Sequence, residues 1–364
     1  LVQAELSAAS DVAVLRPLLC LLSLSFAEGN LQSAVQMAHI LLHRATATGS
    51  LLSQLLAHLA LGAAAYEMND LPRAAEHFEQ GARLRHGSHA RGGHECLVGL
   101  ALTCHAQGRR EAVKATLARL NDLHGDLASS VLAAEAATLQ LRLGMDGAYS
   151  GIQTALRRCA PVRTSIWYGW LEIPALTEVR LALGAAQPQN PARIEAVLQE
   201  LWAAAQQLHR PGLQAAVLAS MALLHQRRNQ SQAAAACLRQ SLDLGEKHGF
   251  VRSIADTGPA LGPLLAELAA LQPSAYIEQV RAAITKSDAR QPEAENRRST
   301  PKLAAPLTRR EREVLSLLGQ YRTDREIAET LVISPLTVRT HIENLASKLA
   351  ANGRRAIVSR AREH

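Results

Sequence analysis

Three side chains able to hydrogen-bond to nucleic-acid bases, Arg339, Thr340 and Glu343, share the outward face of a helix expected to begin at Ser334. On such a face an arginine can donate two hydrogen bonds to guanine, a threonine methyl group can contact thymine, and a glutamate can accept a hydrogen bond from cytosine. This pattern predicts a base-reading surface. The alternative is a small helical bundle whose polar face is merely solvated.

Three predicted helix N-termini determine where this helix face lies in the domain. Capping boxes run from Thr308 to Glu311 and from Thr323 to Glu326, and Ser334 followed by proline begins the third helix. Only two residues separate the second and third helices, which is the helix-turn-helix arrangement whose second helix enters the DNA major groove. At 100° per residue, one face of the third helix is apolar and is expected to be the core: Val338, Ile342, Leu345 and Leu349.

Further side chains near these helix starts are candidates for positioning contacts to the phosphate backbone. They are Thr323, Arg325, Ser334, Thr337, His341 and Lys348. The charge distribution agrees with this, because residues 301–364 hold 12 Lys and Arg against 7 Asp and Glu, and so carry most of the net charge of +7.

The C-terminal residues closely resemble the LuxR-type helix-turn-helix. The resemblance rests on Leu307-Thr308, Arg310-Glu311, Glu313-Val314-Leu315, Glu326-Ile327-Ala328, Leu331, Ile333-Ser334, Thr337-Val338-Arg339, His341 and Lys348-Leu349. It implies that Arg339, Thr340 and Glu343 hold the usual base-reading positions. Tyr321, Asp324 and Ala350-Ala351 depart from the common pattern of the family. Glu343 stands where some members carry a basic residue, so the operator sequence of a relative cannot be assigned to this protein.

Composition predicts an all-α protein for the rest of the chain. Of 364 residues 48% are hydrophobic but only 3% are aromatic, which favours packed helices over a β-sandwich. The length allows two or three domains. Five scattered cysteines without a C-x-x-C pair, no membrane span and no signal peptide favour a reducing, cytoplasmic setting.

Residues 1–285 are expected to form a helical array, because apolar positions follow the helical period and short Gly- or Asn-bearing breaks recur. Leu61-Gly62, Ala74 and Phe78 fit the tetratricopeptide pattern, and Ala222 to Leu244 is a looser unit. A tetratricopeptide-like superhelix is favoured over an irregular bundle. Polar residues 286–303 then read as a flexible linker, and residues 304–364 as the DNA-binding domain.

An array ahead of a LuxR-type domain resembles the large MalT-like regulators. In that family a switch ATPase precedes the array, yet no G-x-x-x-x-G-K-[ST] motif and no cofactor motif occurs here. The chain is therefore expected to be the C-terminal part of such a regulator, or a short ATPase-free one. The resemblance implies an inducer or protein partner on the array, a homodimer or larger assembly on DNA with Arg354 to Arg362 as the pairing face, and RNA polymerase as a partner by analogy.

Two other groups of residues give weaker evidence for a binding site. His86, His89, His94 and Cys96 have spacings that could serve a metal, but a polar loop is favoured and no metal site is predicted. The rings of Trp167, Tyr168 and Trp170 could stack on a planar or sugar-like ligand, although an aromatic plug between repeats is favoured. No nucleophile and base or paired carboxylates stand at a credible site, so an enzyme is not expected.

These patterns together predict a transcription regulator, an activator by analogy only, that binds double-stranded promoter DNA. The array would sense an inducer or partner and control self-association on repeated half-sites. The rival interpretation is a tetratricopeptide interaction scaffold with a basic helical tail.

Overall fold

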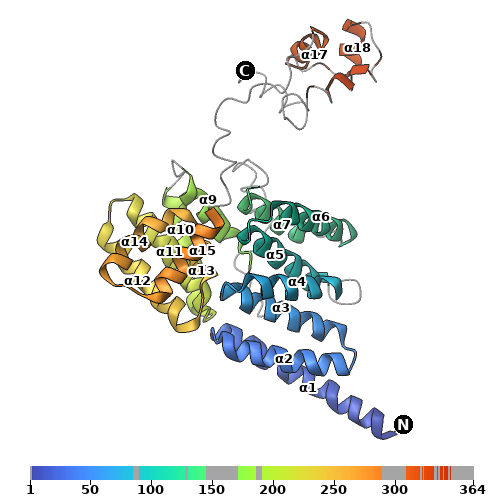
Figure 1. The fold of residues 1–364 in the computed structure, drawn as a ribbon. Helices are drawn as coiled ribbons and strands as arrows, with labels where there is room; N and C mark the ends of the chain where they lie inside the picture. Colours follow the sequence, from blue (N-terminus) through green and yellow to red (C-terminus); the bar gives the residue numbers. More distant parts are fainter. Residues whose placement is uncertain are drawn as a thin grey trace. The chain divides into compact units, whose positions relative to one another are not determined.

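A computed structural model describes residues 2–84, 90–127, 130–144, 171–185, 191–288 and 309–319, together with residues 322, 324–331, 334, 337–338, 340–342 and 345. The chain divides into two compact units, residues 1–291 and 292–364 (Figure 1). Within the described residues the regular structure is entirely helical, which confirms the all-α prediction. No described helix is long and apolar enough to cross a membrane.

The first half of unit 1 is a stack of antiparallel helices in which each packs on its sequence neighbours (Figure 1). The helices are α1 (Val2–Ala27), α2 (Leu31–Ala47), α3 (Leu51–Glu67), α4 (Leu71–Arg83), α5 (Ala90–Ala106), α6 (Arg110–Leu127) and α7 (Ser130–Arg142). Such a stack of neighbouring pairs is the tetratricopeptide-like architecture predicted from the sequence.

The recurring Gly- or Asn-bearing breaks are helix ends. Gly29, Asn69, Gly108, Gly144 and Asn229 all have positive φ angles between 58° and 73°. Glycine and asparagine tolerate this left-handed conformation. At Gly29, Asn69, Gly108 and Asn229 the chain leaves one helix and starts the next after three residues. After most of these turns a backbone N–H also reaches five residues back, as from Asp70 N to Ala65 O at 2.8 Å.

The tetratricopeptide residues meet around one aromatic ring. Phe78 on α4 is fully buried between α3 and α5, where Gly62 and Gly99 face it. A Cβ atom added at Gly62 would lie 2.7 Å from the ring, and one at Gly99 would lie 2.4 Å from it. The two glycines therefore create the space that the ring fills. Gly62 belongs to the predicted Leu61-Gly62, Ala74 and Phe78 pattern, whereas Gly99 was not part of it.

The second half of unit 1 lies beside the first and has its own hydrophobic core (Figure 1). Its elements are α9 (Pro174–Gly184), α10 (Pro191–Gln207), α11 (Pro211–Arg227), α12 (Ser231–His248), α13 (Arg252–Ala255), the 3-10 helix η2 (Pro259–Leu261), α14 (Gly262–Leu271) and α15 (Ala275–Asp288). Antiparallel α11 and α12 form the second repeat-like unit expected from the sequence, with the turn at Asn229.

The regular repeat stops after α12. Gly249 and Gly258 both have positive φ angles, and Pro259 and Pro263 fall at the starts of η2 and α14, so only short helices form between them. One consequence matters for the site below: α13 is turned toward the C-terminal end of α3, where Val251 N donates to Glu67 O at 2.7 Å.

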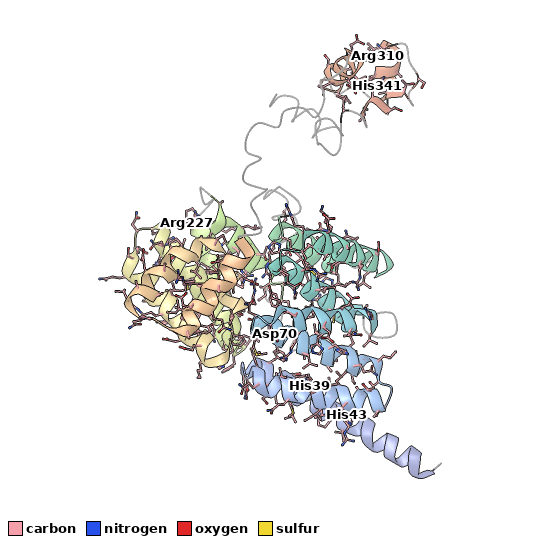
Figure 2. All side chains as sticks on the ribbon, viewed as in Figure 1. His39, His43, Asp70, Arg227, Arg310 and His341 are labelled. Carbon is pink, nitrogen blue, oxygen red and sulfur yellow. The ribbon has the colours of Figure 1, made fainter. Side chains whose placement is uncertain are left out.

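Unit 2 contains α17 (Arg309–Gly319) and α18 (Asp324–Leu331), followed by further helical residues at 337–338, 340–342 and 345. Arg310 and His341 both belong to this unit (Figure 2). In unit 1, α15 extends to Asp288, slightly past residue 286 where the linker was expected to begin. The limits given above for the linker and the DNA-binding domain stay a prediction.

The packing around Phe78 generates a stability prediction. Gly62→Ala should lower the free energy of unfolding by about 1–3 kcal/mol, because its methyl group must displace a fully packed ring. The matched control is Gly184→Ala, also in a helix, where an added Cβ meets nothing within 4 Å. Urea unfolding followed by circular dichroism measures both variants. Equal stability of the two would show that Phe78 can move aside.

Candidate nucleic-acid interface and a buried charge cluster

Unit 2 is held together by a small apolar core that joins its three helical segments. Its buried members are Val314 and Leu318 of α17, Ile327 and Ala328 of α18, and Val338 and Leu345 of the third segment, with Ile342 partly buried against them. Val338, Ile342 and Leu345 therefore lie on the core face, as predicted. Leu349, the fourth expected member of that face, lies outside the described residues.

Arg310 fixes α18 relative to α17. Its guanidinium donates from Nη1 to Glu313 Oε2 at 2.7 Å and from Nη2 to Leu331 O at 2.5 Å. Leu331 is the last residue of α18, so its carbonyl has no partner within the helix. The charged donor satisfies this carbonyl and holds the end of α18 against α17.

The third segment begins as predicted, with Ser334 as its N-cap. Ser334 Oγ accepts a hydrogen bond from Thr337 N at 3.1 Å, and Val338 N donates to Ser334 O at 3.1 Å. With Val338 facing the core, Thr337 and Thr340 are exposed and His341 is half-buried. An exposed polar face opposite a buried apolar face is the arrangement that a recognition helix needs.

The predicted DNA-contacting residues are only partly described. Ser334, Thr337 and Thr340 are exposed, and Arg325 lies in α18. Arg339, Glu343, Thr323 and Lys348 lie outside the described residues, as does the side chain of Arg325. The aromatic candidates Trp167, Tyr168 and Trp170 also lie outside them. The DNA contacts and the aromatic ligand site therefore stay predictions.

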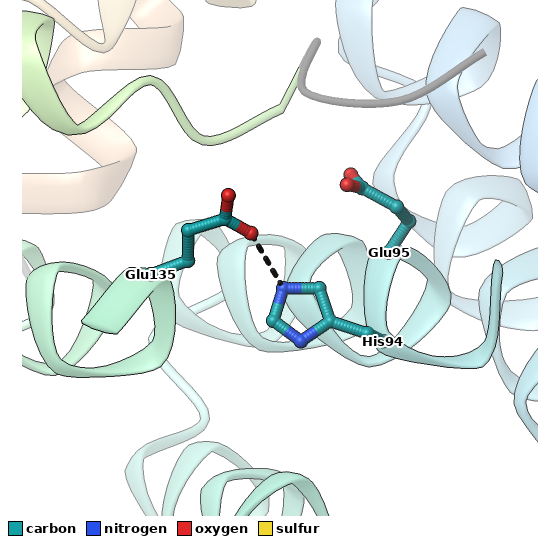
Figure 3. A group of neighbouring side chains, drawn as sticks. All are labelled: His94, Glu95 and Glu135. Atoms are coloured by element: carbon teal, nitrogen blue, oxygen red, sulfur yellow. Dashed lines mark ion pairs between the residues drawn. The ribbon is translucent and has the colours of Figure 1, made fainter. Parts of the chain in front are cut away.

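The histidine-rich segment is described only in part, and its His94 belongs to a buried ion-pair cluster. His94 Nε2 lies 3.3 Å from Glu135 Oε2, and Glu95 is nearby (Figure 3). Arg91 is bonded to both carboxylates, at 2.5 Å to Glu95 Oε1 and 2.7 Å to Glu135 Oε2. A metal ion bound by these carboxylates would compete with the guanidinium of Arg91. We therefore interpret the cluster as a structural link between α5 and α7. Cys96 packs against Gly81, and His86 and His89 are outside the described residues.

A second cluster, which the sequence analysis did not find, joins the two halves of unit 1. Arg142 at the end of α7 donates to Glu172 Oε2 and to Asp256 Oδ2, both at 2.7 Å, and to Leu171 O at 2.9 Å. Tyr66 of α3 donates its hydroxyl to Asp256 at 2.7 Å. Arg252 of α13 pairs with the other oxygen of Asp256. We call these residues, with Arg180 of α9, the charge cluster.

The charge cluster perturbs the pKa values of its members. Burial alone would raise the pKa of Asp256, but Arg252, Arg142 and Arg180 overcome this and lower it to about 2. Burial raises the pKa of Tyr66, and the Asp256 charge raises it further. The paired carboxylates raise the pKa of Arg142 against its burial. Burial lowers the pKa of Arg180 to about 10, so this side chain is still charged at neutral pH.

The sequence carried only faint signals of this cluster. Arg180 is the one basic residue of the largely apolar α9, and Arg252 and Asp256 are spaced for an i, i+4 pair. No periodicity links Arg142 to Asp256, because they are 114 residues apart.

Comparisons with known proteins agree with both units. Residues 3–271 match the model of the MalT-like TPR region, and residues 305–361 match that of bacterial regulatory proteins of the luxR family. The spore germination protein GerE of Bacillus subtilis is 56% identical over 48 residues, which are 13% of this chain and 65% of GerE. The transcriptional regulatory protein LiaR of the same organism is 46% identical over 59 residues, 16% of this chain and 28% of LiaR.

Similarity to full regulators extends into the array. The HTH-type transcriptional regulator MalT of Cronobacter sakazakii is 28% identical over 207 residues, which are 52% of this chain and 22% of that protein. The chain thus spans less than two thirds of the length of each of these relatives.

The fold and the matched regions define a class: proteins in which a MalT-like TPR region is combined with a domain of the luxR family of bacterial regulatory proteins. Because the model of the MalT-like TPR region covers well over half of the sequence, the chain belongs to the MalT-like family. The matched regions are regulatory modules. This confirms the resemblances drawn from the sequence.

The charge cluster generates a second stability prediction. Arg142→Met should lower the free energy of unfolding by about 3–5 kcal/mol, because removing one partner leaves Asp256 and Glu172 buried with less compensation. The control is Arg239→Met, an exposed arginine on α12, which should change stability little. Urea unfolding measures both. A neutral effect of Arg142→Met would show that the two halves do not depend on this pair.

A pH prediction follows from Glu67, whose carboxylate accepts hydrogen bonds from Ser253 N at 3.0 Å and Oγ at 2.9 Å. Burial raises the pKa of Glu67 from 4.5 to about 7. The folded state therefore holds this proton more tightly than the unfolded state, so its stabilising effect is complete below pH 4.5 and is lost as the pH rises through about 7.

Glu67→Gln should remove that part of the pH dependence. Unfolding midpoints in urea, measured across this range, should fall less steeply with rising pH in the variant than in the wild type. The exposed Glu111→Gln is the control and should follow the wild type. Parallel profiles for Glu67→Gln and the wild type would contradict the assignment.

Proposed function

We propose that the protein is a cytoplasmic transcription regulator that binds specific promoter sequences through unit 2 and responds to a ligand or partner held by unit 1. The observation that carries the proposal is the third helical segment of unit 2. Its apolar face is buried on α17 and α18 while Thr337 and Thr340 face outward, and this segment lies within the LuxR-family match.

In this proposal Arg339, Thr340 and Glu343 read base edges. Thr323, Arg325, Ser334, Thr337, His341 and Lys348 contact phosphates and set the register. The local structure supports the division, because the N-cap at Ser334 fixes the start of the segment and Arg310 holds the preceding helix.

One helix-turn-helix unit buries little DNA surface, so useful specificity requires two or more copies on half-sites about one helical turn apart. We therefore propose that the chain acts as a homodimer or larger assembly, and that unit 1 controls this self-association. Recruitment of RNA polymerase, and hence activation, follows only from analogy with the family.

Arg339→Ala tests the base-reading role. Specific binding should weaken by about 1–3 kcal/mol while binding to random DNA changes much less, because only the specific complex uses the bidentate contact. The measurement is fluorescence anisotropy of the full chain on the promoter region next to its own gene, across a salt series.

Two further variants sharpen this experiment. Lys348→Ala should weaken specific and random DNA alike and reduce the salt slope by about one unit, as loss of a phosphate contact does. Arg239→Ala, which removes the same charge from α12, should leave both unchanged. If the wild type binds no DNA specifically even at low salt, the interaction-scaffold alternative replaces this proposal.

A further inference from the structure

Two cavities lie inside unit 1 where its halves meet. Their volumes are about 130 and 260 Å³, and both are lined by Tyr66, Arg142, Arg180 and Asp256. Of these four residues, Tyr66 and Arg142 belong to α3 and α7 of the first half, Arg180 belongs to α9 of the second, and Asp256 directly follows α13. The charge cluster therefore forms the wall that the two cavities share.

The walls carry more positive than negative charge. Arg142, Arg180, Arg210 and Arg252 line one or both cavities, whereas the carboxylates there are Glu67 and Asp256. Asp256 is already engaged by two of the arginines and by Tyr66, and Glu172, behind the wall, accepts from Arg142 and Thr177. These carboxylates thus accept their hydrogen bonds from neighbours other than Arg180, which acts on Asp256 only through its charge.

Arg180 is the arginine left over. Among the residues that the structure describes, it has no hydrogen-bonded or ion-paired partner, and its Nε is a buried donor without an acceptor. Asp256 and Glu172 act on it only at longer range, and burial lowers its pKa. Arg180 as a whole is half-buried, but its Nε is buried, and a buried donor without an acceptor is costly. Such a group in a cavity wall is expected to serve a ligand.

The other wall of the smaller cavity is apolar. Phe26, Leu31, Leu176, Leu213 and Phe250 contribute to it from both halves. An apolar cavity of about 150 Å³ can hold a benzene molecule, so the space suits one ring or a short chain. Guanidinium groups bind carboxylates and phosphates well because their planar donors match two acceptor oxygens.

We propose that this cavity binds a small organic acid, with its carboxylate or phosphate group on Arg180 and its apolar body between Phe26, Leu213 and Phe250. The inference deepens the proposed function, since it names the chemical class of the ligand that unit 1 would sense. Because the ligand contacts both halves of unit 1, its binding stabilises one arrangement of them.

The test uses the full chain and three probes of similar size. Benzoate and phenyl phosphate carry the two candidate anionic groups, and benzamide is the neutral counterpart of benzoate. Calorimetry and thermal unfolding should show binding of at least one anion and none of benzamide. The preferred anion distinguishes a carboxylic acid from a phosphate ester as the natural ligand class.

Variants of Arg180 separate a binding role from a structural one. Arg180→Met should weaken anion binding at least tenfold, yet leave the melting temperature of the unliganded protein unchanged or higher, because it removes a half-buried charge that has no hydrogen-bonded partner. Arg180→Lys keeps the charge but not the planar donors, so it should retain part of the affinity. Arg239→Met, on the surface of α12, should bind as the wild type does.

Three binding results would each overturn the inference: no binding of either anion at millimolar concentration, equal binding of benzamide, or full binding by Arg180→Met. A large fall in the melting temperature of both unliganded Arg180 variants would equally do so, since Arg180 would then be structural. DNA binding is measured on the same preparations. Specific DNA binding without anion binding rejects this inference alone, and anion binding without specific DNA binding rejects the proposed function alone.

Discussion

The architecture of unit 1 depends on the pairing of Arg142 with two carboxylates, those of Glu172 and Asp256. One guanidinium joins the end of α7, the segment leading into α9, and α13 near the end of the array. The neighbouring Tyr66 hydroxyl and the backbone pair between Val251 and Glu67 add α3 to the same junction. Within the stack, neighbouring helices pack on each other, whereas this junction brings together segments far apart in sequence. It is joined by the packing of Phe250 on Leu31 and Ala64.

The junction between the halves of unit 1 includes buried charged groups, and this restricts its geometry. Apolar faces tolerate sliding, whereas a buried arginine and its carboxylates must meet in one geometry or remain unpaired at a cost of several kcal/mol. The pairs thus fix how the two halves meet, while the cores on either side supply most of the stability. The same cost explains why an arginine without such a partner, Arg180, demands a different explanation from Arg142.

The sequence was informative wherever local chemistry decides structure. The turns at Gly29, Asn69, Gly108 and Asn229, the space for Phe78, and the buried face of Val338 and Leu345 all follow from spacing and residue type. The charge cluster could not be predicted in this way. Its pairs join residues up to 190 positions apart, and which buried arginine finds a carboxylate depends on how the halves close.

A ligand can shift an equilibrium only by as much as its affinity differs between the two states. A site within one helical pair would have the same lining however the halves of unit 1 were arranged, so occupying it would not bias their arrangement. The cavities beside Arg180 are different, because their walls come from α3, α7, α9 and α13 together. Any change in how the halves meet must alter these walls, and an occupied cavity must resist that change. At the junction held by Arg142, the free energy of ligand binding can therefore stabilise one arrangement of the two halves over others.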